Sequence, residues 1–147
     1  MKLIYLLFFS LLISGCIKRR PPEVFEFPED FRGCAVIVYG VTNYPQIPME
    51  DGKLIERFPT NGIIITSSIR YDGVARDESY FYGTNGQLVS ISPSIFSENV
   101  GETSQDGKQK LIFEQVFIGS KAELRPKLRE PQKIDMLWEM GYRSQIE

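Results

Sequence analysis

Short runs of apolar and β-branched side chains alternate with turn-forming residues through the first half of the chain. The run at 34–41 is continuous, which is typical of a strand buried on both faces. Shorter runs follow at 53–58 and 63–69, with Pro59-Thr60-Asn61-Gly62 between them. Proline presets φ and Asn-Gly tolerates positive φ, so this tetrapeptide predicts a turn. The pattern therefore predicts three strands in this half.

A hairpin is predicted around Asn85-Gly86, a pair that favours two-residue type I′ loops. Counting outward from such a loop, Tyr82 opposes Val89 and Tyr80 opposes Ile91. These four side chains then share one face of the hairpin, and we expect that tyrosine face to touch the core.

The second half of the chain contains one strong strand pattern and two helix signals. Residues 92–109 are polar and predict a long exposed loop. Residues 110–118 are apolar on both faces, with Glu114 and Gln115 as the polar interruptions, so this strand needs cover on both sides. Ser120-Lys121-Ala122-Glu123 has the spacing of a helix-starting capping box. An apolar stripe that includes Trp138 predicts a helix over 131–141.

Together these elements predict a mainly β fold, an antiparallel β-sandwich or open barrel of five to seven strands with a short C-terminal helix. The predicted organisation has three parts. Residues 1–15 are a signal peptide, residues 16–30 a charged tether that contains Pro21-Pro22, and residues 31–147 a single β-rich domain. The part that follows the signal peptide has the size of one ordinary domain.

The first sixteen residues have the layout of a secretory signal. Lys2 precedes an apolar run from Leu3 to Ile13, and small residues then lead to a cysteine. The sequence Ile13-Ser14-Gly15-Cys16 resembles the lipobox of bacterial lipoproteins. As a helix the apolar run spans roughly 16 Å against about 30 Å for a bilayer core, so a permanent span is disfavoured. The basic triplet Lys18-Arg19-Arg20 follows the apolar run, whereas only Lys2 and the amino terminus precede it. The positive-inside rule would place the excess of positive charge before the run.

The lipobox resemblance implies that cleavage follows Gly15 and that Cys16 carries a diacylglyceryl group on sulfur and an N-acyl chain. Two or more acyl chains anchor firmly, whereas one gives only marginal binding. Ile17 after the cysteine implies delivery to the outer membrane in a diderm, and a monoderm would keep the protein on the outer face of its cell membrane. We expect no other cofactor. The expected partners are the membrane and an envelope protein, with no nucleic acid and no small-molecule substrate.

Composition narrows the function further. The chain has 17 basic and 19 acidic residues, and this mild balance argues against nucleic-acid binding, which calls for a concentrated basic face. It has no histidine, which excludes Ser-His-Asp, Cys-His and histidine-based metal sites. Enzymes that use carboxylate pairs or lysine stay open. We assign no catalytic residue and no metal ligand set from the sequence.

Cys34 is the second of the two cysteines. If Cys16 is a thioether, the two cannot form a disulfide. Cys34 opens an apolar run, so we expect it to pack as a small hydrophobe.

One acidic stretch could bind a cation. Asp72, Asp77 and Glu78 lie within seven residues, and Ca²⁺ takes six to eight oxygen ligands. The spacing does not match an EF-hand, and Arg76 would compete for the same carboxylates. The alternative is a solvated connection between two strands. Nearby tyrosines are expected to pack within strands, with Tyr71 among the loop exceptions that could be exposed.

The turns and strands at Gly33–Tyr39, Asp51-Gly52, Phe58-Pro59, Gly62–Ser67 and Tyr71-Asp72-Gly73 resemble small bacterial lipoproteins that carry a domain of unknown function. The resemblance covers about residues 28–125 and supplies no activity and no catalytic residues. We therefore expect a membrane-tethered extracytoplasmic lipoprotein, a non-enzymatic binding or envelope-associated module. The alternatives are a histidine-free enzyme that uses carboxylates and a small lipoprotein inhibitor or immunity factor.

Overall fold

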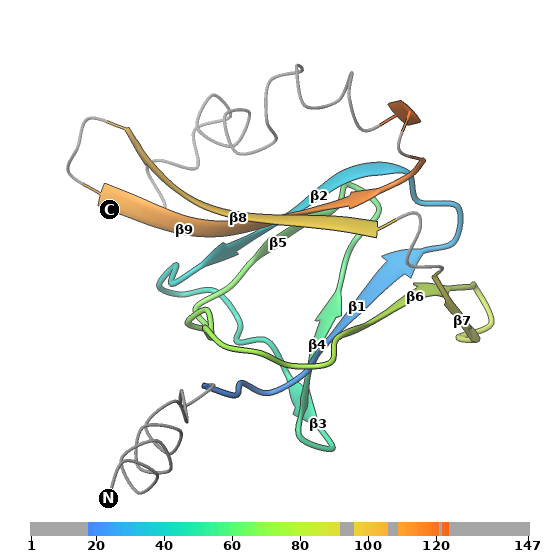
Figure 1. Ribbon diagram of the computed structural model, residues 1–147, viewed down its shortest axis with the longest axis horizontal. Helices are drawn as coiled ribbons and strands as arrows, with labels where there is room; N and C mark the ends of the chain where they lie inside the picture. The colour runs from blue at the N-terminus through green and yellow to red at the C-terminus, as the bar shows by residue number, and fades with distance from the viewer. Residues whose placement is uncertain (1–17, 92–95, 106–108, 121, 124–147) are drawn as a thin grey trace, which may run out of the picture.

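The computed structural model describes residues 18–91, 96–105, 109–120 and 122–123. The nine named elements in these residues are all strands, and they form two sheets that face each other (Figure 1). The strands are β1 (Glu23–Pro28), β2 (Gly33–Tyr39), β3 (Met49–Glu50), β4 (Lys53–Arg57), β5 (Ile63–Ile65), β6 (Glu78–Tyr82), β7 (Leu88–Ser90), β8 (Phe96–Gln105) and β9 (Gln109–Ile118).

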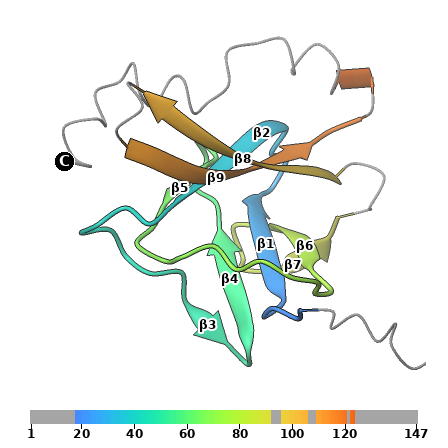
Figure 2. The same cartoon turned by 60° about the vertical axis from the view of Figure 1, so that its left-hand side comes forward.

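The first sheet has five strands in the order β3-β4-β1-β6-β7. Its central strand β1 pairs in parallel with β4 and β6, and the edge strands β3 and β7 pair antiparallel. The second sheet has four strands in the order β5-β2-β9-β8. In it β5 is parallel to β2, and the other pairs are antiparallel. The fold is a mainly β sandwich that is not closed into a barrel, as Figure 2 shows from a second direction.

The sheets are mixed, whereas the sequence predicted an antiparallel arrangement. The difference arises because the chain alternates between the two sheets. It runs from β1 to β2 in the other sheet, returns for β3 and β4, crosses again for β5 and returns for β6. A crossing strand thus replaces the helix that usually separates parallel neighbours. The same alternation gives nine strands within the described residues, more than the five to seven expected.

The main core lies between the two sheets. Alternation along each strand turns every second side chain inward, and these positions are mostly apolar. Its fully or nearly fully buried members are Phe25, Phe27, Ala35, Ile37, Tyr39, Phe58, Ile91, Val116 and Ile118. Burying each large side chain of this kind stabilises the fold by about 1.5–3 kcal/mol.

A smaller cluster lies on the opposite face of the second sheet, where Val36, Val38 and Phe113 pack together with Val41. Strand β9 therefore buries Val116 on one face and Phe113 on the other. This confirms the prediction that the strand at 110–118 is covered on both sides.

Strand β1 overturns the predicted tether over residues 16–30. Glu23–Pro28 forms the centre of the five-stranded sheet, and Phe25 and Phe27 are fully buried. Before that strand, Arg19 already makes an isolated bridge with Val74. The parallel partners of β1 lie some thirty and more than fifty residues away, so no local pattern marks it as a central strand. The fold therefore begins well before residue 31.

The predicted hairpin forms with a longer loop. The Gly83 N–H donates to the Gln87 carbonyl at 3.0 Å, and the Gly86 N–H donates to the Gly83 carbonyl at 2.9 Å. Gly86 has a φ of 77°. These contacts describe a turn followed by a left-handed glycine, the common three-residue hairpin loop, in place of the predicted two-residue loop.

The longer loop moves the register of the hairpin by one residue. Tyr82 pairs with Leu88 and Phe81 pairs with Val89. A one-residue slip exchanges the two faces of a strand. Accordingly Phe81 packs against the core, and the face that carries Tyr80 and Tyr82 lies on the other side. The prediction of a core-facing tyrosine face is wrong for this reason.

Strand β8 overturns the predicted loop at 92–109. Its backbone pairs with β9 along ten residues, from Phe96 opposite Ile118 to Gln105 opposite Gln109. Strand β8 lies at the end of the strand order, so it needs only one hydrogen-bonded neighbour. An edge strand tolerates polar residues that a central strand excludes, and the hydrophobic pattern therefore did not reveal it.

Local turn and cap signals match the structure closely. Asp51-Gly52 joins β3 to β4 as a two-residue loop in which both φ angles are positive, 49° and 77°. The Gly62 N–H donates to the Pro59 carbonyl at 2.8 Å and closes the predicted turn. The Ser120 N–H donates to Glu123 Oε2 at 2.6 Å, and the Glu123 N–H reaches Ser120 Oγ at 3.4 Å. This reciprocal pair confirms the capping box.

Two predicted features lie outside the described residues. They are the signal peptide with its cleavage and lipidation site at Gly15-Cys16, and the helix over 131–141. Among the residues that are described, no helix has the length and apolar character that crossing a bilayer requires.

Candidate functional site

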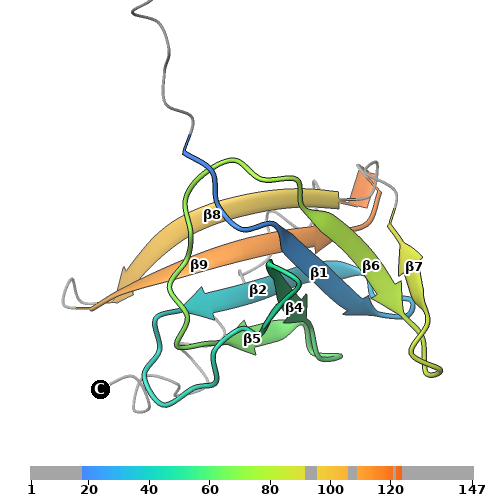
Figure 3. The same ribbon diagram turned by 90° about the horizontal axis from the view of Figure 1, so that it is seen from below.

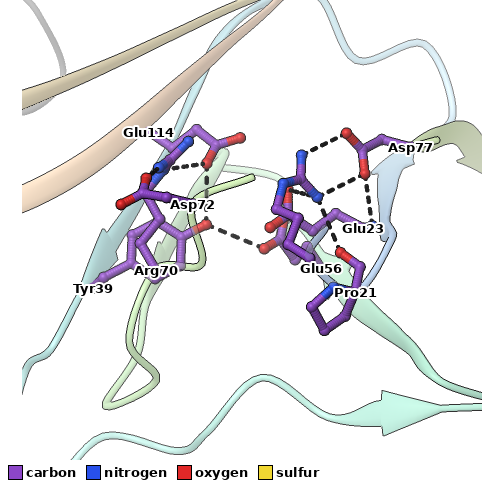
Figure 4. A network of polar contacts seen from close by, with 9 residues as sticks. Pro21, Glu23, Tyr39, Glu56, Arg70, Asp72, Asp77 and Glu114 are labelled. Carbon is purple, nitrogen blue, oxygen red and sulfur yellow. Dashed lines mark hydrogen bonds and ion pairs between the residues drawn. The ribbon is translucent and has the colours of Figure 1, made fainter. Parts of the chain in front are cut away.

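The inward face of the sandwich changes from apolar to acidic at one end. Glu23, Glu56 and Glu114 each lie two residues before a core side chain, so strand alternation turns them inward. They come from β1, β4 and β9, and each is no more than 2% exposed. Figure 4 shows them with the arginines and the tyrosine around them. Buried carboxyl groups at this density require cations or protons to compensate them.

Tyr39 on β2 links two of these carboxyl groups across the sandwich. Its hydroxyl oxygen lies 3.2 Å from Glu56 Oε1 and 3.3 Å from Glu114 Oε2. Burial raises the pKa of the Tyr39 hydroxyl, and the two glutamates raise it further, so the hydroxyl stays neutral. It has one proton and can donate to only one carboxyl group. The other carboxyl must therefore be the protonated partner if both contacts are hydrogen bonds.

We assign this proton to Glu56. Burial raises its pKa well above the usual range of a glutamate, and the charges of Glu23 and Glu114 act in the same direction. Glu114 instead faces a cation, because Arg70 Nε donates to its Oε2 at 3.3 Å. With this proton on Glu56, its carboxyl group can donate to the Tyr39 hydroxyl oxygen, and the Tyr39 hydroxyl can donate to Glu114. One chain of hydrogen bonds thus connects the two sheets.

Arg20 closes the network on its other side. Its Nη1 and Nη2 donate to Asp77 Oδ1 and Oδ2 at 2.8 and 2.6 Å, a bidentate pair. Nη1 also lies 3.2 Å from Glu23 Oε2 and donates to the Pro21 carbonyl at 3.1 Å. The Glu23 N–H donates to Asp77 Oδ1 at 2.9 Å. The buried Arg20 guanidinium therefore ties the segment before β1 to the start of β6.

Replacing Glu56 by glutamine should change how stability depends on pH. The raised pKa means that the folded protein keeps a proton that the unfolded chain releases, so wild-type stability falls as pH rises from the unfolded pKa toward the folded one. The loss reaches at most about 1.4 kcal/mol per pH unit. The Glu56→Gln variant cannot ionise at this position. Its stability relative to wild type should therefore increase with pH.

Urea unfolding midpoints measured from about pH 5 to pH 8 test this expectation. Glu50→Gln is the matched control, because Glu50 is an exposed glutamate and its variant should follow the wild type. A constant difference between Glu56→Gln and wild type over this range would contradict a protonated Glu56.

A cleft of about 300 Å³ opens beside the network, between β4 and β5. This volume is at the lower end of small-ligand sites. The residues that line it include the apolar side chains of Ile47, Pro48, Ile55, Ile64 and Ile65 and the charged residues Glu50, Glu56 and Arg57. Glu56 is 1% exposed, so its carboxyl group offers almost no surface to a reacting molecule.

The predicted acidic stretch does not form one cluster. Each of its carboxylates pairs with a different cation: Asp72 with Arg70, Asp77 with Arg20, and Glu78 with Lys53. Within the described part of the chain, no three Asp, Glu, Cys or His side chains are arranged to hold a metal ion. The role of Asp77 that the structure does show is its bidentate pair in the buried network.

Cys34 lies in β2 opposite Phe117 and is half-buried. Gln115 Nε2 donates to its sulfur at 3.2 Å. These contacts fit a packed side chain within the second sheet.

Sequence reasoning missed Arg20, Glu23 and Glu56. The first two fell within the predicted tether, and the inward face of the strand that holds Glu56 was not assigned. Glu114 was noted only as a polar interruption. One signal was present, because in each strand the two-residue period that places core side chains also reaches a glutamate.

The fold resembles a solved crystal structure from Bacillus anthracis of a protein provisionally named a lipoprotein. The two chains are 20% identical with a TM-score of 0.70, and the match covers 86% of this chain and 98% of that one. At this identity the likeness shows a common fold. No curated protein matches the sequence.

A family model described as a family of unknown function, DUF6843, matches residues 19–125. The match covers more than half of the chain. Its first residue, Arg19, is also where the bridge to Val74 forms, so the family's domain includes β1 and Arg20. The chain therefore belongs to the DUF6843 family, whose function is unknown.

Proposed function

We propose that this protein is a lipoprotein of the bacterial cell envelope, anchored by acyl chains on Cys16, whose domain is a non-enzymatic binding module with an envelope protein as its partner. Support comes from the lipobox at Ile13-Ser14-Gly15-Cys16 and from a structural neighbour provisionally named a lipoprotein. Two acyl chains or more supply firm anchoring without a membrane-spanning helix.

The observation that carries the proposal is the order of the segments along the sequence. The apolar run from Leu3 to Ile13 leads through Ser14-Gly15 to Cys16, and the family match begins three residues later, at Arg19. Cleavage between Gly15 and Cys16 would therefore leave the whole matched domain on the mature chain. A signal peptide must be removable in this way.

The buried network supports the non-enzymatic part of the proposal. Glu56 and Glu114 converge on Tyr39, yet both carboxyl groups are almost completely buried. A carboxylate pair in a hydrolase has to flank a bound substrate. The pair in this fold instead spans the two sheets, which gives it a structural role.

The anchor is tested by replacing Cys16 with serine and fractionating the producing cells. Wild type should sediment with membranes and enter the detergent phase on phase separation, whereas Cys16→Ser should leave both fractions almost completely, because it lacks the acyl chains. Cys34→Ser is the matched control and should behave as wild type, since Cys34 lies in β2 and not in the lipobox. Retention of Cys16→Ser in the membrane at the wild-type level would overturn the proposal.

A further inference from the structure

The connection between β5 and β6 exposes apolar side chains close together in sequence. Ile69 is 68% exposed, Val74 is 63% exposed and Tyr71 is 37% exposed. Single exposed apolar residues are normal on a protein surface, but several on one loop commonly mark a contact with another molecule or a membrane. The polar network does not use any of these three side chains.

This loop is fixed against the first described residues of the chain. Val74 bridges to Arg19, its N–H donates to the Lys18 carbonyl at 2.9 Å, and its own carbonyl accepts the Arg20 N–H at 3.4 Å. Figure 3 shows the loop running beside the start of the chain. Gly73 is needed for this approach, because a Cβ at that position would lie 2.7 Å from the Lys18 carbonyl oxygen. The loop is therefore held beside residues 18–20, just after the proposed anchor residue Cys16.

Three cations lie near Val74, two through its backbone contacts and one two residues further along the chain. Lys18, Arg19 and Arg76 are all exposed. Asp72 is the exposed acid of the loop, and Arg70 pairs with it. Aliphatic and tyrosine side chains next to lysine and arginine are the combination that settles at a lipid headgroup layer.

The distance to the proposed anchor is short. Arg19 is three positions after Cys16, so an extended chain reaches at most about 10 Å between them. Paired backbones lie about 5 Å apart, which places Val74 within roughly 15 Å of Cys16. Given the anchor of the proposed function, on which this inference rests, the loop has little freedom to move away from the bilayer surface.

We infer that residues 69–76, with Lys18 and Arg19, form a membrane-contact face that lays the domain directly on the bilayer holding Cys16. The occupant of this face is the lipid headgroup layer. The three exposed cations suit an anionic surface, where each adds on the order of 1 kcal/mol of attraction. The acyl chains supply attachment, and this face fixes the orientation of the sandwich above the membrane.

A pair of matched valines tests the inference. In a Cys34→Ser background, Val74→Cys and Val89→Cys each offer one thiol for a fluorescent label, because lipidated Cys16 has no free thiol. Val89 is similarly exposed, at 56%, and lies on the β6–β7 hairpin away from the start of the chain (Figure 3). The full lipidated chain is reconstituted into vesicles of phosphatidylethanolamine and phosphatidylglycerol that contain a lipid-borne quencher. Equal urea midpoints for the two labelled proteins confirm that both are folded.

The label at residue 74 should be quenched roughly twofold or more above the label at residue 89. Equal quenching of the two labels, on protein that floats with the vesicles, would overturn the membrane-contact face and leave the anchor standing. A loop that binds a protein partner in place of the membrane would give this same result. Lipidated protein that fails to float with the vesicles would instead refute the anchor. The two failures are therefore distinguishable.

Discussion

Replacing Arg20 by alanine should lower the free energy of unfolding by about 3–5 kcal/mol, as expected when one partner of a buried ion pair is removed. The Arg20 side chain is 7% exposed and makes a bidentate contact with Asp77 together with an ion pair to Glu23. The substitution removes the cation that these two carboxylates share, while the Glu23 side chain stays 3% exposed and the Asp77 side chain 22% exposed. Urea unfolding of the purified protein measures the loss.

Its neighbour Arg19 provides the control. Arg19 is exposed, so Arg19→Ala should change stability by no more than about 0.5 kcal/mol. Arg20→Met retains most of the apolar stem. It should still show most of the stability loss expected for Arg20→Ala, because the carboxylates require the positive charge. Equal small losses for both alanine variants would show that the chain around Arg20 is not part of the fold.

Replacing Phe27 by alanine should cost about 3–5 kcal/mol, the usual range for a buried phenylalanine. Phe27 is fully buried and stacks on Phe58 with ring centroids 4.6 Å apart and planes 7° apart. Phe31 stacks on it with centroids 5.5 Å apart. The substitution removes the Phe27 ring and leaves a cavity beside the rings of Phe31 and Phe58.

Chemical unfolding again measures this effect, with Val89→Ala as the exposed control that should change little. The result bears directly on where the domain begins. If residues 16–30 were a tether, Phe27→Ala would be almost neutral. A loss below about 1 kcal/mol would therefore contradict the central position of β1.

Local chemistry predicted the parts of the fold that depend on a few neighbouring residues. The turn at 59–62 and the Ser120–Glu123 capping box each require two to four adjacent residues, and both form as expected. The two-faced strand at 110–118 was predicted for a similar reason, because six of its nine residues are apolar.

Features that depend on distant partners could not be predicted. The Glu23–Pro28 strand has a parallel neighbour on each side, and neither is close to it in sequence. The polar strand β8 acquires its hydrogen bonds from β9 alone. The hairpin register differs from the prediction because Asn-Gly fits both two-residue and three-residue loops, and the loop that forms is the one with Phe81 packed against the core.

The candidate site was predicted less well than the fold. Sequence reasoning placed Asp77 in an acidic stretch that either binds a cation such as Ca²⁺ or is a solvated connection, whereas in the structure it pairs with Arg20, more than fifty residues away. A single glutamate within a strand is ordinarily interpreted as outward-facing, because glutamate is usually exposed, and the two-residue period was the one indication against that interpretation. The parallel register of β1 and β4 and the facing position of β9 bring the three glutamates together.

The most direct test of the account is the intact mass of the protein extracted from the membranes of its producing cell. The account predicts a polypeptide that starts at Cys16, has lost residues 1–15 and carries the added mass of a diacylglyceryl group at its N-terminal residue. A full-length chain in the membrane fraction with an unmodified Cys16 thiol would contradict it.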